Sequence, residues 1–303
     1  MLDTKTKAEM ICHMLSGSGY EAYEVGGCVR DSWLEKTPKD YDITTNATPD
    51  QIKEVFEQFQ CLDIGAAFGI ITVMVEGEPF EIATFREDSK SSDNRHPDEV
   101  KFASDITADL SRRDFTMNAI AWNIAKAEYV DPFGGIDDII NKKIKFVGDP
   151  AERIKEDHLR VLRAYRFVSQ LGFDLEQHTR TALMLETRRT NILEGVSQER
   201  ITAEMNKILV GKNCFHALFL MAVDGILWEI IPELKDQLSP HNNKWHLESI
   251  DQFGNSIFTH TLLVVDSASK SLHTIHPDHQ VNFMWAALLH DISKVQCREI
   301  QLI

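Results

Sequence analysis

The sequence contains no long hydrophobic run. No stretch of about 18 apolar residues occurs in the chain, so we expect no membrane-spanning helix. The first residues, MLDTKTKAEMICHML, lack the basic segment followed by an apolar segment that marks a secretory signal. These absences argue against membrane and secreted proteins and favour a cytoplasmic location. The 43% hydrophobic content of the 303 residues supports ordinary buried cores in two or three domains.

Cysteine and positive charge are both scarce. The five cysteines are scattered, odd in number and nowhere spaced as C-x-x-C, which argues against a disulfide scaffold and favours reduced thiols. Lysine and arginine total 32 against 47 aspartates and glutamates, and the net charge of −15 argues against a protein that coats nucleic acid. Cations do gather between residues 142 and 207, where they can still guide a single RNA terminus.

The most informative stretch is YEVGGCVRDSWLEKTPKDYDITTNATP, residues 23–49. Residues 23–25 are β-prone, and Gly26 and Gly27 then permit a sharp turn whose N–H groups a phosphate can approach. We expect residues 28–34 to form a helix whose first turn points N–H donors at the same place. Arg30 adds a guanidinium that can bind phosphate oxygens in pairs.

Two carboxylates follow the glycine turn. Asp40 and Asp42 stand two residues apart in DYDIT, and on a strand such residues point to the same face. The pair repels itself unless a cation lies between the carboxylates, and Mg²⁺ prefers such oxygen ligands together with substrate phosphates. Alone, a Gly-Gly pair is usually a turn and Asp-x-Asp is usually a solvated pair, but their combination predicts a metal-dependent nucleotide site.

Strand patterns dominate the next segment. Residues 61–64 and 69–75 are apolar and β-branched, and residues 80–85 return after a turn at Glu76-Gly77, which predicts a hairpin beside the Asp40 strand. Glu81 interrupts the apolar returning strand. It is either an outward-facing residue of an edge strand or a third carboxylate for the metal. Residues 87–100, EDSKSSDNRHPDEV, indicate a polar loop.

The order GG-x-VRD, D-x-D and T-x-A-x-P resembles the class II tRNA nucleotidyltransferase (CCA-adding) and bacterial poly(A) polymerase family. The resemblance covers about residues 20–210. It implies an α+β fold, in which a polymerase-β-like head with a mixed sheet precedes all-helical regions. We expect a catalytic head over residues 1–148, a helical neck with base recognition over 149–211, and a helical body with a partial HD-like region over 212–303.

A second motif, RRDFTMNA, covers residues 112–119. An Arg-Asp pair is by default an ordinary surface pair, but the resemblance implies that Arg113 contacts the triphosphate. It assigns Asp114 and Asn118 to the ribose, whose 2′-OH needs both an acceptor and a donor. It also favours Glu81 as a third catalytic carboxylate, and it links a flexible loop at residues 87–100 to addition of the terminal A.

From residue 150 to about residue 211 the pattern is helical. Within EDHLRVLRAYR, residues 156–166, Asp157, Arg160 and Arg163 follow one another at i+3 and would share a helix face. A simple salt-bridge ladder is one interpretation. The other comes from base chemistry: cytosine and adenine present an amino donor beside a ring-nitrogen acceptor, which suits an aspartate beside an arginine, whereas uracil and guanine present the reverse order. The family motif E-D-x-x-R-x-x-R has this templating role.

The resemblance therefore implies addition of CTP- and ATP-derived nucleotides to a tRNA 3′ end without a template. The catalytic residues would be Asp40, Asp42 and Glu81, with Mg²⁺ on the two aspartates. The partners would be the tRNA 3′ end, CTP and ATP. Neither DNA nor a membrane is expected as a partner. The predicted nucleotide-binding residues are Gly26, Gly27, Arg30, Arg113, Asp114, Asn118, Asp157, Arg160, Arg163 and Arg166.

Several alternatives stay open at this point. Within the class they are a poly(A) polymerase and a partial enzyme that adds CC or A. A third is a metal-dependent HD phosphohydrolase, because His260 and the pair His290-Asp291 resemble that pattern. Ending at Ile303 before a final aspartate favours a truncated or degenerate HD region, and the histidines could equally be packed core residues. A non-catalytic RNA-binding module is disfavoured by the intact Asp40 and Asp42.

Overall fold

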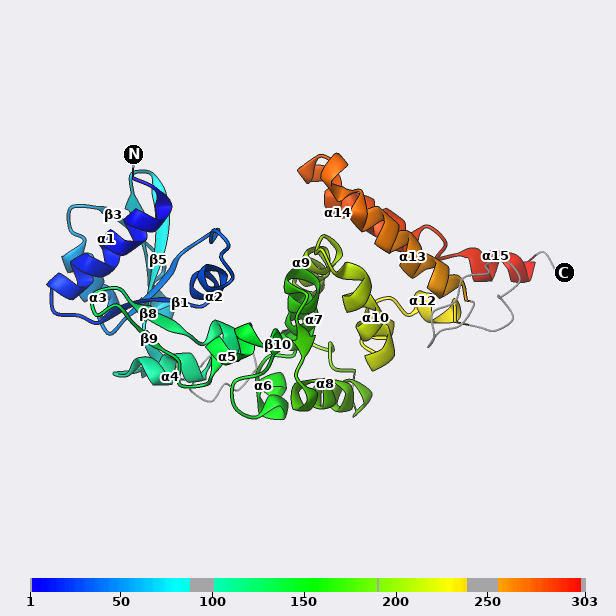
Figure 1. Ribbon diagram of the computed structural model, residues 1–303, viewed down its shortest axis with the longest axis horizontal. Coiled ribbons are helices and arrows are strands. Elements are labelled where there is room, and N and C mark those ends of the chain that lie inside the picture. The colour runs from blue at the N-terminus through cyan, green and yellow to red at the C-terminus, as the bar shows by residue number, and fades with distance from the viewer. Residues whose placement is uncertain (1, 88–100, 190, 239–255, 301–303) are drawn as a thin grey trace. The chain divides into compact units, whose positions relative to one another are not determined.

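The computed structural model describes residues 2–87, 101–189, 191–238 and 256–300. The chain separates into two compact units, residues 1–156 and residues 157–303. The first combines a sheet with helices, and the second is almost wholly helical, which confirms the α+β class (Figure 1). The finer division at residues 148 and 211 stays a prediction.

The first unit is built around a mixed sheet that has seven strands in the described part of the chain. β2 and β5 run parallel, whereas the other neighbouring pairs run antiparallel. The β4–β5 hairpin therefore lies beside β2, as predicted. The spatial order is β3 (Gln60–Gly65), β4 (Ile70–Val75), β5 (Glu78–Thr84), β2 (Asp42–Thr45), β1 (Ala22–Val25), β8 (Ala121–Asn123) and β9 (Glu128–Val130). Shorter strands of the chain are β6 (Arg86–Glu87), β7 (Lys101–Phe102), β10 (Lys143–Ile144) and β11 (Asp174–Leu175).

Side-chain caps start several helices of this unit, whereas α2 and α5 begin after glycines without such a cap. Asp3 caps α1 by accepting from the Thr6 N–H. Thr48 and Gln51 form a reciprocal capping box that starts α3 with proline in its first turn. The helices are α1 (Thr4–Gly17), α2 (Gly27–Trp33), α3 (Pro49–Val55), α4 (Ile106–Ser111), α5 (Gly135–Ile140) and α6 (Pro150–Glu156), with 3₁₀ turns η1 (Ala66–Phe68) and η2 (Thr116–Asn118).

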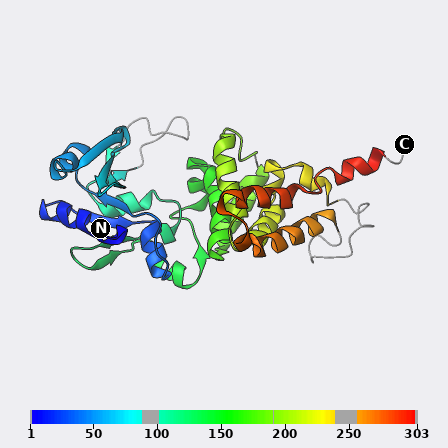
Figure 2. The ribbon, with the colours of Figure 1, turned by 90° about the horizontal axis from the view of Figure 1, so that it is seen from above.

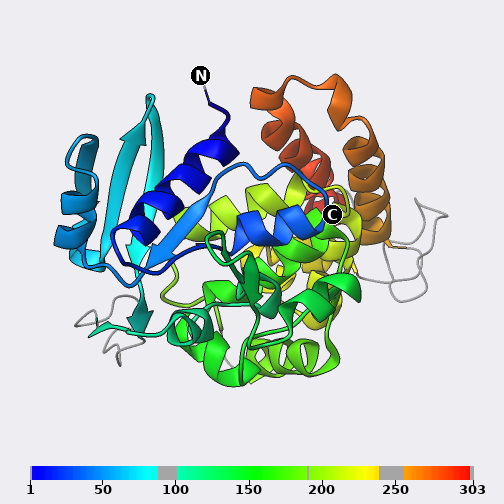
Figure 3. The same ribbon diagram turned by 60° about the vertical axis from the view of Figure 1, so that its left-hand side comes forward.

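The core of the first unit includes the interface between the sheet and α1. α1 lies against β1 and β2, and its inner face is buried at Ala8, Ile11 and Leu15 (Figure 3). Alternate residues of β4 and β5, such as Ile71 and Ile82, are buried while their neighbours are not. The alternation leaves one face of β5 available for polar side chains.

The second unit is a set of packed helices. α7 packs against α9 and α10, and α13 runs beside α14 (Figures 1 and 2). Buried apolar side chains such as Leu162, Met205 and Leu218 join the first three of these helices. The elements are α7 (Leu159–Leu171), α8 (Gln177–Arg189), α9 (Gln198–Leu209), α10 (Cys214–Asp224), α11 (Leu227–Ile230), α12 (Glu233–Asp236), α13 (Ile257–Lys270), η4 (Leu272–Thr274), α14 (Pro277–Leu289) and α15 (Lys294–Ile300). Among the described helices, none has the length and apolar character needed to cross a bilayer.

Candidate active site

The candidate carboxylates lie on and beside two adjacent strands. Asp42 is the first residue of β2, Glu81 lies within β5, and Asp40 precedes β2 and does not belong to it. The parallel register pairs Ile43 with Ile82, both buried, so Asp42 and Glu81, one residue earlier on each strand, point to the opposite, solvent-facing side. Because β5 lies between β4 and β2, the edge-strand interpretation of Glu81 is wrong.

The charges of these three carboxylates influence one another. The pKa of Asp42 is raised, first by loss of hydration and then by the negative charge of Asp40, with a smaller contribution from Glu81, while Arg113 acts in the opposite direction. Their ligand atoms do not form a cluster within 4.8 Å among the described residues. Mutually repelling carboxylates supply oxygen ligands and call for a cation between them, which fits Mg²⁺.

Gly26 lies between residues that the sequence predicts to bind the triphosphate and the metal. It ends β1, precedes α2 and has a φ of +74°, a conformation that favours glycine. A Cβ built on Gly26 would stand 2.9 Å from Arg113 Nη1 and 3.8 Å from Asp42 Oδ2. The two motifs predicted from sequence, which are about 80 residues apart, therefore converge on one glycine turn.

Arg30, Asn118 and Asp114 form a connected hydrogen-bond chain. Arg30 Nη1 donates to Asn118 Oδ1 at 2.7 Å, and Asn118 Nδ2 donates to Asp114 Oδ1 at 3.1 Å. Asp114 Oδ1 also accepts from the Phe115 N–H at 2.8 Å. Asp114 and Asn118 are both buried, so these bonds fix the amide and the carboxylate that the sequence assigns to the ribose.

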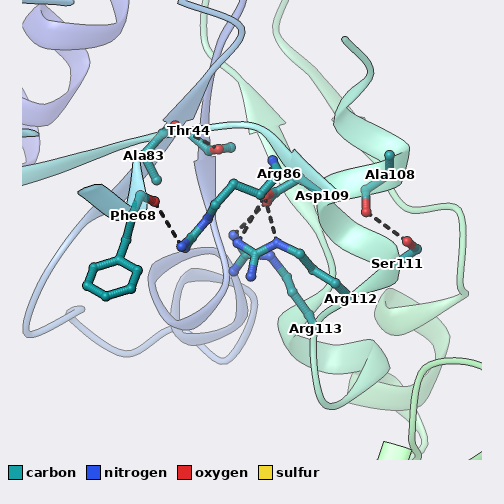
Figure 4. Close-up of polar contacts among 9 residues, drawn as sticks. All are labelled: Thr44, Phe68, Ala83, Arg86, Ala108, Asp109, Ser111, Arg112 and Arg113. Atoms are coloured by element: carbon teal, nitrogen blue, oxygen red, sulfur yellow. Dashed lines mark hydrogen bonds and ion pairs between the residues drawn. The ribbon is translucent and has the colours of Figure 1, made fainter. Parts of the chain in front are cut away.

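Asp109 joins this site although the sequence analysis did not single it out. Figure 4 shows Arg86, Arg112 and Arg113 around its fully buried carboxylate. Oδ1 accepts from the Arg86 N–H at 3.2 Å and from Arg112 Nε and Nη2 at 3.1 and 3.0 Å, and Oδ2 accepts from Arg113 Nη2 at 3.1 Å. The spacing of three and four residues to the two arginines was a readable signal, since such pairs meet on a helix.

The helix that was to carry base recognition is interrupted. α6 ends at Glu156 and α7 begins at Leu159, so Asp157 lies between the two helices and the prediction of one continuous face through Asp157 is wrong. Its carboxylate accepts from the Leu159 N–H at 3.1 Å and from Arg200 Nη2 at 2.9 Å. These bonds replace the helical environment and hold Asp157 at the start of α7, one turn before Arg160.

Arg160 and Arg163 lie on α7 at i and i+3, and both side chains are partly exposed. Arg166, one further step along, is different: it is 9% exposed, and its Nη1 donates to Glu204 Oε1 of α9 at 3.2 Å. Its guanidinium also lies 4.5 Å from the centre of the Phe167 ring. The burial of Arg166 against α9 indicates a contribution to helix packing.

His260, His290 and Asp291 come together in the second unit. The two histidine Nε2 atoms are 3.3 Å apart, and His290 Nε2 lies 3.4 Å from Asp291 Oδ2, which also accepts from Lys294 Nζ at 2.7 Å. One possible ligand atom from each residue of the trio lies within 4.8 Å of those of the other two. His290 is exposed and His260 partly exposed, so the interpretation of the histidines as packed core residues is wrong.

The predicted polar loop lies almost entirely outside the described residues. Arg86 and Glu87 form β6, which pairs antiparallel with β7 at Lys101 and Phe102, and residues 88–100 fall between the two strands. Asp109 accepts from the Arg86 N–H and so fixes the chain one residue before the loop begins.

Two sequence families match the chain. Residues 22–145 match the family described as the poly A polymerase head domain. Residues 172–238 match the family described as the probable RNA and SrmB-binding site of polymerase A. The first match contains the glycine turn, the three carboxylates and the RRDFTMNA motif, and it ends within the first compact unit.

Known relatives bear the name CCA-adding enzyme. The chain is 42% identical over 224 residues to the CCA-adding enzyme of Bacillus velezensis and 43% identical over 231 residues to that of a Geobacillus species. The alignments cover 74% and 76% of this chain, and the chain spans 55% of the length of each relative.

The fold also resembles a solved structure, the Bacillus stearothermophilus CCA-adding enzyme in complex with CTP. That comparison covers 100% of this chain and 84% of the other, with 28% sequence identity and a TM-score of 0.67. Sequence, fold and site geometry agree. The chain belongs to the nucleotidyltransferase family with a poly(A) polymerase head domain, of which the CCA-adding enzymes are members.

Proposed function

We propose that this chain adds CCA to the 3′ end of tRNA from CTP and ATP, without a nucleic-acid template. The observation that carries the proposal is the convergence of Asp42, Arg113 and Asn118 on the turn at Gly26. At this turn the carboxylate predicted to bind metal and the guanidinium predicted to bind the triphosphate lie near the backbone carbonyl of Asn118, whose side chain is the predicted ribose amide. The similarity to CCA-adding enzymes, one of them solved with CTP, supports the same choice.

The chain itself binds and orients the nucleotide. Gly26 and Gly27 leave the backbone open to the phosphates, and Arg30 and Arg113 supply guanidinium groups on either side of the turn. Asn118 is fixed by Arg30 and in turn donates to Asp114, so the ribose meets an amide and a carboxylate already in place. This preorganisation lowers the entropy cost of bringing the α-phosphate to the tRNA terminus.

Asp40 and Asp42 are the proposed Mg²⁺ ligands, with Glu81 on the neighbouring strand as the third carboxylate. When bound there, Mg²⁺ supplies Lewis acidity that lowers the pKa of the tRNA 3′-OH and offsets negative charge on the α-phosphate. The pKa of Asp42 is raised first by loss of hydration and then by the negative charge of Asp40, and a bound cation would offset both effects.

The reaction is an in-line displacement. The tRNA 3′ oxygen forms a bond to the α-phosphorus as the bond from that phosphorus to the pyrophosphate oxygen breaks, and the hydroxyl proton is lost. Arg113 and Arg30 remain on the phosphates that leave as pyrophosphate. The residues of the chain therefore hold and orient the nucleotide and offset the negative charge of its phosphates, and no covalent enzyme intermediate is needed.

Base choice is assigned to the second unit. Asp157 accepts from the amino group and Arg160 donates to the ring nitrogen, an arrangement that suits cytosine and adenine. The bond from Arg200 to Asp157 holds this carboxylate in place outside the helix. Arg163 extends the same face, and Arg166 supports α7 through Glu204. The five free cysteines fit a cytoplasmic location.

The test uses tRNA that lacks its terminal CCA, with Mg²⁺ and each nucleoside triphosphate offered separately. We expect wild-type protein to incorporate C, C and then A, and Asp42→Asn to lose at least about a thousandfold in rate, because the charge is lost at the reacting centre. Initial rates and gel-resolved products measure this. The variant should keep the wild-type circular dichroism spectrum.

Asp50→Asn is the matched control, because Asp50 lies on the surface of α3 with a side chain that is 93% exposed. It should turn over like the wild type. Near-normal incorporation by Asp42→Asn would refute the catalytic assignment. Addition of a long A tail from ATP alone would favour a poly(A) polymerase instead.

A further inference from the structure

The carboxylate of Asp109 is the centre of a buried charge network in the first unit. It is 0% exposed, yet four N–H groups surround it: one from the Arg86 backbone, two from Arg112 and one from Arg113. Burial raises the pKa of Asp109, but the charges of Arg113 and Arg112 and their hydrogen bonds outweigh it and leave the pKa below the ordinary value. The buried side chain is therefore ionised at neutral pH.

This network holds one end of Arg113 and leaves the other end at the site. Nη2 donates to Asp109 Oδ2 at 3.1 Å, while Nη1 lies 2.9 Å from the position that a Cβ on Gly26 would occupy. Arg113 Nε is buried and has no hydrogen-bond partner among the described residues. In that part of the chain, Asp109 is thus the side chain that sets the orientation of the Arg113 guanidinium.

The same carboxylate also ties down the strand that carries Glu81. Oδ1 accepts from the Arg86 N–H, two residues beyond the end of β5, and Arg86 Nη1 donates to the Phe68 carbonyl at 3.0 Å (Figure 4). Asp109 consequently connects α4 and Arg113 with the end of a strand whose middle presents a candidate carboxylate. An ordinary ion pair on the surface would not link Arg113 to the strand that carries Glu81.

We propose that Asp109 is a positioning residue that aims the Arg113 guanidinium at the nucleotide triphosphate beside Gly26. The proposal rests on the function proposed above and deepens it. Asp109 does not touch the nucleotide, and it acts through Arg113. Because the triphosphate is common to all nucleotides, Asp109 governs how tightly CTP and ATP bind but not which base is chosen.

The test is a double-mutant cycle with Asp109→Asn and Arg113→Ala in the full chain. Asn keeps the shape of Asp but loses the charge and offers a donor to one of the guanidiniums. We expect Asp109→Asn to raise KM for CTP and for ATP by about tenfold or more, with kcat within about twofold and an unchanged CTP-to-UTP preference. In the Arg113→Ala background, the same substitution should change KM by less than about twofold.

Asp224→Asn is the matched control, since Asp224 is equally buried and pairs with Arg180 at 2.9 Å in the second unit. It should lower the melting temperature without raising KM. Should Asp109→Asn fail to fold, Asp109→Glu carries the test: it keeps the charge, moves the acceptor by one methylene and should also raise KM.

Three results separate the proposals. A wild-type chain that binds no nucleotide defeats the proposed function itself. A wild type and an Arg113→Ala variant that behave as expected, with an unchanged KM in the Asp109 variants, overturn the positioning role alone. Independent, multiplicative KM effects of Asp109→Asn and Arg113→Ala would also overturn it, because they would show that Asp109 does not act through Arg113.

Discussion

Acidic side chains in the first unit behave differently because their neighbours differ. Asp109 is buried among guanidinium groups, whereas Glu24, on β1, is 6% exposed and its Oε1 has no hydrogen-bond partner among the described residues. Loss of hydration, with a smaller contribution from Glu9, raises the pKa of Glu24 to about 7. The same burial thus leaves one carboxylate ionised and makes the other an acid that titrates near neutrality.

A pH dependence of stability follows for Glu24. Its folded pKa of about 7 exceeds the ordinary 4.5, so the folded state binds the extra proton between these values and loses stability as pH rises through them, by about 3 kcal/mol at most. Glu24→Gln stays neutral and should remove this decline. Urea unfolding of both proteins between pH 5 and about 8 measures it. An equal decline in Glu24→Gln would contradict the assignment.

Sequence reasoning at this scale found residues that share a motif and missed residues whose role depends on burial. The spacing within GGCVRD and RRDFTMNA pointed to Arg30, Asp114 and Asn118, and the structure joins these three by hydrogen bonds. The arginines three and four residues after Asp109 were a signal in the sequence. The bond from the Arg86 N–H to Asp109 and the burial of Glu24 depend on three-dimensional packing.

At the scale of elements, the β-branched, apolar run before Glu76-Gly77 and the returning run after it were enough to predict the hairpin of β4 and β5. The break between α6 and α7 was not predictable, because EDHLRVLRAYR contains neither glycine nor proline. Two bonds to Asp157 accompany the break: a local one from the Leu159 N–H and a tertiary one from Arg200, on α9. Local sequence patterns cannot reveal that Asp157 has a partner 43 residues away.

This break sharpens the prediction for base choice. Asp157→Ala removes the acceptor that C and A need but gives U and G no donor, so selectivity against UTP should fall by roughly tenfold to a hundredfold, the value of one buried hydrogen bond. CTP and ATP should also be used less well. Single-nucleotide incorporation with all four triphosphates measures this.

An equal proportional loss of the incorporation rates with all four triphosphates would contradict this prediction. If all four rates drop together in Asp157→Ala and the preference for C and A survives, Asp157 serves as a partner of Arg200 and the template lies elsewhere. Lys155→Ala is a suitable control, because Lys155 is exposed on α6 and pairs with Glu152 at 3.0 Å. It should leave selectivity unchanged.

At the scale of the whole molecule, the order of motifs was enough to predict a sheet-containing head followed by helices. The two compact units divide the proposed tasks: the carboxylates, the glycine turn and Arg113 belong to residues 1–156, and Asp157 with Arg160 belongs to residues 157–303. The first unit has its own sheet and a core that includes Tyr23 and Phe85. It therefore has the features of an independently folding domain.

A fragment of residues 1–156 should accordingly fold cooperatively and bind triphosphates without choosing among bases. We expect its affinities for CTP and UTP to agree within about threefold, less than the discrimination that one hydrogen bond supplies. Thermal unfolding and titration calorimetry check both statements. A fragment that retained a clear preference for CTP would place base recognition in the first unit.

The glycine at position 26 also shapes how the sequence can vary over time. A single base change in its codon that alters the residue adds a Cβ or stops the chain. Any such Cβ meets Arg113 Nη1 at 2.9 Å on a backbone with φ of +74°. No intermediate substitution exists at this position, because alanine is already the smallest residue that can replace glycine. Descendants of this chain therefore either keep Gly26 or give up the geometry around it in one step.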